Sequence, residues 1–173
     1  MRTVTPLAVV AALLLAPASQ AEPAPLAKDL AADLADVKGK LVGLAEAIPA
    51  DQYGWAPAEG VRTVSQALMH VAGGNYFFVN FLGGEVPAGV DPRGLESITD
   101  PAEVKKQLAA SFDTLSALIG NASEERLAET VDMFGRQATI AGAMHSAVSH
   151  GHEHLGQMIA YARSVGVTPP WSL

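Results

Sequence analysis

Apolar residues recur at intervals of three and four along several segments of the chain, the spacing that places them on one face of an α-helix. The first such segment runs from about residue 25 to residue 47, and Pro49 ends it. The second begins at Thr63, where the letters T-V-S-Q predict a capping box with Gln66, and it runs to the pair 83–84, both glycine. Both segments are therefore predicted to be helices.

Two more helices are predicted in the second half of the chain. Asp100 precedes a proline and an acidic residue, which predicts an N-cap for a helix that stops near Gly120. The last runs from about Thr139 to Val165, and residues 121–138 are interpreted as a polar connection with room for a short helical turn. No segment has a strand pattern of comparable strength. Four amphipathic helices with long connecting loops predict an all-α fold, a four-helix bundle.

The N-terminus has the pattern of a secretory signal peptide. Arg2 is followed by an apolar run from Leu7 to Ala16, and small residues at Ser19 and Ala21 suit cleavage before Glu22. The apolar run is shorter than the roughly 20 residues that a membrane-spanning helix needs. We therefore predict a signal peptide over 1–21, a single domain over 22–173, and export to a periplasm or the exterior.

Charge and composition exclude several classes of function. Removal of residues 1–21 takes away Arg2 and no acidic residue, so the formal net charge changes from −7 to −8. An acidic chain without a Lys/Arg cluster predicts no nucleic-acid partner and no membrane partner after signal cleavage. The chain has no cysteine, so any metal must be held by nitrogen and oxygen atoms.

The stretch VSHGHEHLGQMIAY contains three of the five histidines. On an ideal helix His150 and His154 lie about 40° apart, and Gln157 and Tyr161 share their stripe. Two histidines at positions i and i+4 can present both imidazoles to one ion, although helices also carry such pairs incidentally.

The remaining features of this stretch are less informative. His145 and His152 fall on nearly the opposite side of the helix, where we expect solvent. The letters HGHEH also match an inverted zinc-peptidase pattern, but none of the nineteen residues after His154 is acidic, and the match is interpreted as coincidental. Glu153 lies about 60° from His150, so it could reach the rim of a site as a supporting group or a base.

His70 supplies a third candidate ligand, on the second predicted helix. Two adjacent glycines, Gly73 and Gly74, follow it, and each costs about 1 kcal/mol relative to alanine in a helix interior. Room for a ligand or close helix packing would offset that cost. If the second and fourth helices are neighbours, three neutral imidazoles converge and leave one coordination position of an ion open, as in catalytic sites.

The segments YGWAPAEGVRTVSQALMHVA and HSAVSHGHEHLGQMIAYARSVGVTPP resemble the DinB/YfiT-like superfamily of metal-binding four-helix bundles. The resemblance covers about residues 25 to 170. It implies a divalent ion, zinc or nickel, at His70, His150 and His154. Some relatives are transferases or isomerases that use a low-molecular-weight thiol, and dimers are common, which makes a homodimer a family-based expectation.

Two hypotheses of function follow from these residues. The first is an exported metal-dependent enzyme, of the hydrolase or thiol-dependent transferase class, acting on a small molecule that the sequence does not identify. The predicted export argues against a thiol cofactor, because those thiols are cytoplasmic. The second is a non-enzymatic metal- or ligand-binding bundle. Catalytic candidates are Glu153, Gln157 and Tyr161. Aromatic residues that could line the walls of the site, or simply form core, are Trp55, Tyr76, Phe77 and Phe81.

Overall fold

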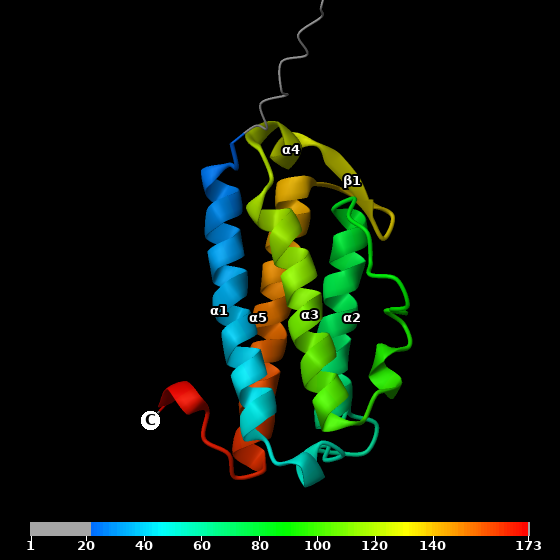
Figure 1. Cartoon of the computed structure of the whole chain (residues 1–173), viewed down its shortest axis with the longest axis vertical. Coiled ribbons are helices and arrows are strands. Elements are labelled where there is room, and N and C mark those ends of the chain that lie inside the picture. The colour runs from blue at the N-terminus through cyan, green and yellow to red at the C-terminus, as the bar shows by residue number, and fades with distance from the viewer. Residues whose placement is uncertain (1–21, 173) are drawn as a thin grey trace, which may run out of the picture.

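The computed structural model describes residues 22–172, in which four long helices lie side by side (Figure 1). The four predicted helices are confirmed, and the predicted signal peptide lies outside the described residues. Within 22–172, no helix is both long enough and apolar enough to cross a membrane. The elements are α1 (Pro25–Ala47), α2 (Val64–Phe81), α3 (Pro101–Gly120), α4 (Glu124–Ala128), β1 (Thr130–Met133), β2 (Arg136–Thr139) and α5 (Ile140–Ser164), with 3-10 turns at Ala50–Gln52, Leu95–Ser97 and Pro170–Ser172.

Side-chain caps fix the starts of α2 and α3. The Thr63 hydroxyl accepts a hydrogen bond from the Gln66 N–H at 3.2 Å, and the Gln66 side chain accepts one from the Thr63 N–H at 2.9 Å. This is the predicted capping box, which satisfies two backbone donors that a helix start leaves free. The Asp100 carboxylate likewise accepts from the Glu103 N–H at 2.9 Å.

The order of the helices around the bundle places α2 beside α5. Both α1 and α2 pack against α3 and α5, so α1 and α2 are diagonal partners. Figure 1 shows that α2 and α3 run in the same direction. Parallel neighbours cannot be joined by a short turn, so the chain returns along the outside of α2 in a long crossover over residues 82–100, which carries the 3-10 turn Leu95–Ser97.

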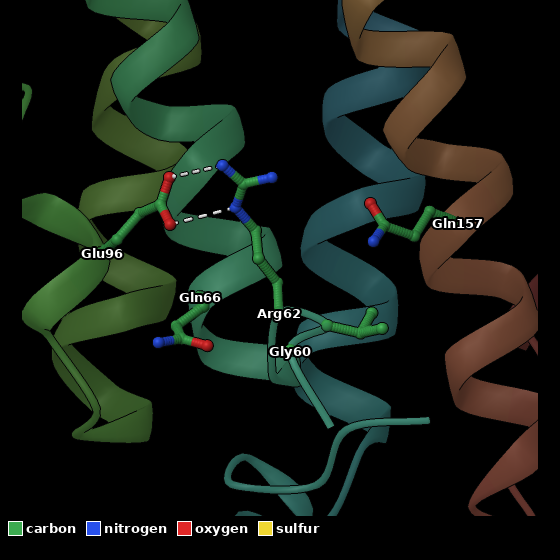
Figure 2. A pocket seen from close by; sticks show the side chains of 6 residues that line it. Gly60, Arg62, Gln66, Glu96 and Gln157 are labelled. Carbon is green, nitrogen blue, oxygen red and sulfur yellow. Dashed lines mark hydrogen bonds and ion pairs between the residues drawn. The ribbon is translucent and has the colours of Figure 1, made fainter. Parts of the chain in front are cut away.

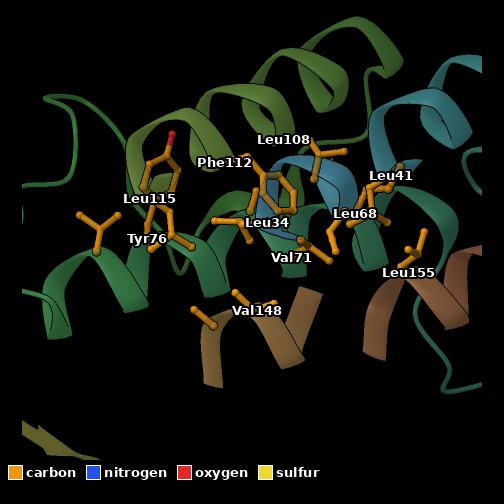
Figure 3. Close-up of a cluster of buried hydrophobic side chains, with 14 of the residues drawn as sticks. Leu34, Leu41, Leu68, Val71, Tyr76, Leu108, Phe112, Leu115, Val148 and Leu155 are labelled. Atoms are coloured by element: carbon orange, nitrogen blue, oxygen red, sulfur yellow. The ribbon is translucent and has the colours of Figure 1, made fainter. Parts of the chain in front are cut away.

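The core lies between the four long helices and consists mainly of leucine and other aliphatic side chains (Figure 3). Tyr76 is 1% exposed and belongs to this core. Of the two interpretations of Tyr76, wall of the site or core, the core interpretation is therefore confirmed. Neighbouring positions on a helix differ by 100°, so when Phe77 faces outward Tyr76 turns inward.

The segment after α3 departs from the sequence prediction. The expected helical turn is present as α4, but β1 and β2 form an antiparallel hairpin in which Met133 pairs with Arg136. The prediction missed it for two reasons. Most residues of the two strands are exposed, so no apolar alternation marks them, and the turn residues Phe134 and Gly135 are not the usual Asn-Gly or Asp-Gly pair. The hairpin packs against α2 and α5.

Candidate metal centre

His70 of α2 and His150 and His154 of α5 converge in the structure. Each offers a ring nitrogen, and these nitrogens all lie within 4.8 Å of one another. The ring centroids are 4.5 Å apart for His150 and His154, 4.8 Å for His70 and His154, and 5.4 Å for His70 and His150. The sequence-predicted set is thus brought together at the α2–α5 contact.

Glycine in α2 makes this convergence possible. A Cβ atom added to Gly74 would stand 2.4 Å from Cε1 of His150, far inside van der Waals contact. A Cβ atom added to Gly73 would stand 2.8 Å from the carbonyl oxygen of Pro92 in the crossover. Gly73 therefore leaves room for the crossover, and Gly74 leaves room for the His150 imidazole from α5.

A carboxylate supports His70 from behind. Nδ1 of His70 lies 2.9 Å from Oε1 of Glu96, and Arg62 donates two hydrogen bonds to the same carboxylate, at 3.0 and 3.2 Å (Figure 2). Partial burial opposes ionisation of Glu96, but the hydrogen bonds and charges of Arg62 and His70 outweigh it and hold the pKa of Glu96 below its ordinary value. An ionised carboxylate only accepts, so Nδ1 of His70 donates and Nε2 is the nitrogen of His70 left to bind an ion.

His154 is oriented in the same way by an amide. Nδ1 of His154 lies 2.7 Å from Oε1 of Gln157, which can only accept. Nε2 of Gln157 donates to the Tyr161 hydroxyl at 3.0 Å, and that hydroxyl donates to the carbonyl oxygen of Arg62 at 3.1 Å. This chain of hydrogen bonds fixes the amide and leaves Nε2 of His154 free to bind a ligand.

His150 differs from the other two histidines. Its Nδ1 is buried and has no hydrogen-bond partner among residues 22–172. Burial, and then the charges of His154, His70 and Arg62, lower the pKa of His150 to about 4. Burial also lowers the pKa of His154, although its hydrogen bond to Gln157 works in the opposite direction. At neutral pH His150 and His154 are therefore uncharged and have lone pairs available.

The other predicted residues fall in different places. Gln157 and Tyr161 join the site through His154, whereas Glu153 is exposed on α5. His145 and His152 are exposed, as expected, and Nε2 of His152 lies 2.8 Å from the Asp33 carboxylate on α1.

Sequence reasoning missed Arg62 and Glu96. Arg62 lies next to the Thr63 N-cap, and Glu96 lies in a loop that has no periodicity, so neither position carried a signal of its own. Together with Gln66 and Gln157, they line a polar cavity of about 640 Å³ beside the histidines (Figure 2).

Comparison with known proteins places this chain in a family. The model of the DinB superfamily matches residues 33–158. The YjoA protein of Bacillus subtilis is 26% identical over 128 residues, which cover 72% of this chain and 81% of YjoA. The crystal structure of YjoA aligns with a TM-score of 0.64 at 21% identity and covers 81% of this chain and 93% of that chain.

Two further solved structures share the fold. A DinB-like protein from Bacillus cereus has a TM-score of 0.71 at 14% identity and covers 82% of this chain and 93% of its own. YfiT from Bacillus subtilis, described as a probable metal-dependent hydrolase with an unusual four-helix bundle topology, has a TM-score of 0.66 at 19% identity. That alignment covers 88% of this chain and 97% of YfiT. The chain belongs to the DinB superfamily.

Proposed function

We propose that this protein is an exported metal-dependent enzyme of the hydrolase class, with a zinc or nickel ion held by His70, His150 and His154. The observation that supports the proposal is the convergence of three imidazoles from two helices, with nitrogens within 4.8 Å of one another. The description of YfiT as a probable metal-dependent hydrolase favours this class. Thiol transfer is the less favoured chemistry, because the proposed export separates the protein from cytoplasmic thiols.

The side chains present fit such an ion. Three neutral nitrogen ligands suit zinc or nickel, and the unpartnered, buried Nδ1 of His150 is a polar atom whose burial is otherwise uncompensated. Nitrogens on one tetrahedral zinc ion lie about 3.3 Å apart, so binding would draw the nitrogens together by at most about 1.5 Å. A divalent ion with three protein ligands leaves a position open for water or substrate and lowers the pKa of a water bound there.

The surrounding residues would orient the ligands of this centre and provide a cavity for a substrate. Glu96 and Gln157 each hold one histidine in the tautomer with a free Nε2, and Arg62 fixes Glu96 with two hydrogen bonds. The polar cavity beside them offers donors and acceptors to a small-molecule substrate. Its polar lining is consistent with a substrate whose polar group is held next to the ion.

Metal analysis of protein purified without a histidine tag tests the proposal. We expect about one zinc or nickel ion per chain in the wild type, and loss of the ion in His70→Gln and His154→Gln. His152→Gln is the matched control, because that histidine lies on the same helix but is exposed and contacts Asp33. Wild-type protein that stays metal-free after incubation with either ion would refute the metal centre.

A hydrolysis screen separates an enzyme from a binding protein. Esters, amides and lactones of small acids are tested with and without a chelator, and a parallel screen adds glutathione or another thiol. Turnover that the chelator abolishes, that the metal restores and that His154→Gln lacks supports the hydrolase. Metal binding without turnover in either screen would favour the non-enzymatic bundle instead.

Export and association are proposed from the sequence, and each has a direct test. Mass spectrometry of the protein from its native host, after separation of cytoplasm from exported fractions, should give a chain that begins at Glu22. Light scattering during gel filtration should give the mass of a homodimer. A full-length chain in the cytoplasm, or a monomer at micromolar concentration, would refute the respective proposal.

A further inference from the structure

A second cavity, apolar rather than polar, adjoins the histidines. Its volume is about 280 Å³, and nearly all of its lining is apolar. We call it the phenylalanine pocket. It is lined by Phe77, Phe78 and Phe81 of α2, Phe134 at the hairpin tip, Gly74, and the rings of His70 and His150. The pocket is thus bounded at one end by two candidate metal ligands.

Aromatic rings connect the histidines to the hairpin without a break. The centroid of the Phe78 ring lies 5.9 Å from that of His150 and 6.3 Å from that of Phe81. The Phe81 ring in turn lies 4.8 Å from the Phe134 ring, in an edge-on arrangement. A ligand group in the pocket would therefore meet ring faces and edges along the whole of one side.

Phe134 is an unusual residue for its position. It has a φ of +55°, Gly135 follows with a φ of +80°, and together they form the two-residue turn of the hairpin. Such turns favour asparagine, aspartate or glycine, and a bulky residue with positive φ is strained. The side chain is nevertheless 81% exposed, so it gains little from burial. Backbone strain that is not offset by burial of the side chain is characteristic of functional positions.

We propose that the phenylalanine pocket binds an apolar, aryl-sized group of the substrate, whose polar group then lies at the histidines, and that Phe134 is the specificity-determining residue. This deepens the proposed function and rests on it for the placement of the polar group. A cavity of roughly 150 Å³ is enough to bind benzene. The pocket therefore has room for a phenyl ring and a short linker.

Two hydroxamates that differ only in their apolar part test the proposal on metal-loaded protein. Benzohydroxamate carries a phenyl ring, and acetohydroxamate carries a methyl group. We expect benzohydroxamate to bind at least tenfold more tightly, a difference of about 1.4 kcal/mol, by calorimetry. Equal affinities would overturn the proposal and leave the metal centre intact.

The variant Phe134→Asn isolates the role of the side chain. Asparagine tolerates positive φ, so the melting temperature should be unchanged or higher, while the preference for benzohydroxamate should fall at least fivefold. Gln137→Ala, on the exposed part of the same hairpin, should retain the preference. A Phe134→Asn variant that keeps the full preference would exclude Phe134 as the specificity residue.

Metal-free protein provides an independent measurement. Benzyl alcohol should show saturable binding to chelator-treated wild type in saturation-transfer NMR, and weaker binding to Phe134→Asn. If neither hydroxamate binds but this result is obtained, the proposed function fails and the pocket stands as an apolar binding site. No saturable binding of benzyl alcohol would overturn the pocket itself.

Discussion

The close approach of His150 to Gly74 leads to a quantitative prediction for the substitution Gly74→Ala. The added methyl carbon would lie 2.4 Å from Cε1 of His150 and 3.1 Å from each ring nitrogen, whereas ordinary contacts begin at 3.4 Å. The ring must therefore move by about 1 Å or more. Metal–ligand distances tolerate only about 0.2 Å, so His150 would leave the ligand position.

We expect the affinity of Gly74→Ala for zinc to fall at least 100-fold, or about 2.7 kcal/mol, because one of three ligands is displaced. The stability of the metal-free protein should change little, since alanine favours the helix by about 1 kcal/mol and offsets part of the displacement. Competition with a fluorescent zinc chelator measures the affinity, and thermal unfolding in EDTA measures the stability.

Gly156→Ala on α5 is the matched control. Its added methyl carbon would meet nothing within 4 Å, and the position lies only two residues from His154. The control should gain about 0.5–1 kcal/mol of stability and keep wild-type zinc affinity. If Gly74→Ala also kept wild-type affinity in protein that folds normally, the assignment of His150 as a ligand would be refuted.

Three further predictions concern charge and buried hydrogen bonds. Metal-free protein should lose about 2 kcal/mol of stability as the pH falls from 6.5 to 4, because the pKa of His150 is lowered to about 4 and the unfolded chain takes up its proton first. Urea unfolding at several pH values measures this loss, and the free energy of unfolding of His150→Gln should depend less on pH. Glu96→Gln should weaken zinc binding about 10- to 100-fold, while the exposed Glu153→Gln should change it less than twofold, as measured by chelator competition. Ser111→Ala should cost about 1–3 kcal/mol in urea unfolding, because the fully buried Asn75 amide donates to the Ser111 hydroxyl at 3.0 Å; an unchanged midpoint would contradict this.

The helices could be predicted because their signals are local. The capping box at Thr63 and the N-cap at Asp100 each lie within four residues of the chain, and the structure reproduces both. The hairpin could not be predicted, because its strands are mostly exposed and Phe134 occupies a turn position at which asparagine or glycine is the usual residue.

The candidate site shows the same division. The shared face of His150 and His154 follows from helix geometry. His70 could be added because its convergence with them requires only that the second and fourth predicted helices are neighbours. Glu96 approaches His70 through the path of an irregular loop, which no periodicity encodes. Glu153 is exposed on α5, and its helix angle alone does not tell how far its carboxylate stands from the histidines.

The parallel course of α2 and α3 has a consequence for how this architecture can diversify. The crossover over residues 82–100 must span the length of the bundle, and it brings Pro92 against Gly73 and Glu96 against His70 on the way. The histidines are fixed by helices that also build the core, whereas the acid behind one of them is carried by a surface loop that tolerates insertion and replacement. Exchange of that loop alone would change the basicity of a ligand and the shape of the entrance while the helical framework is inherited unchanged.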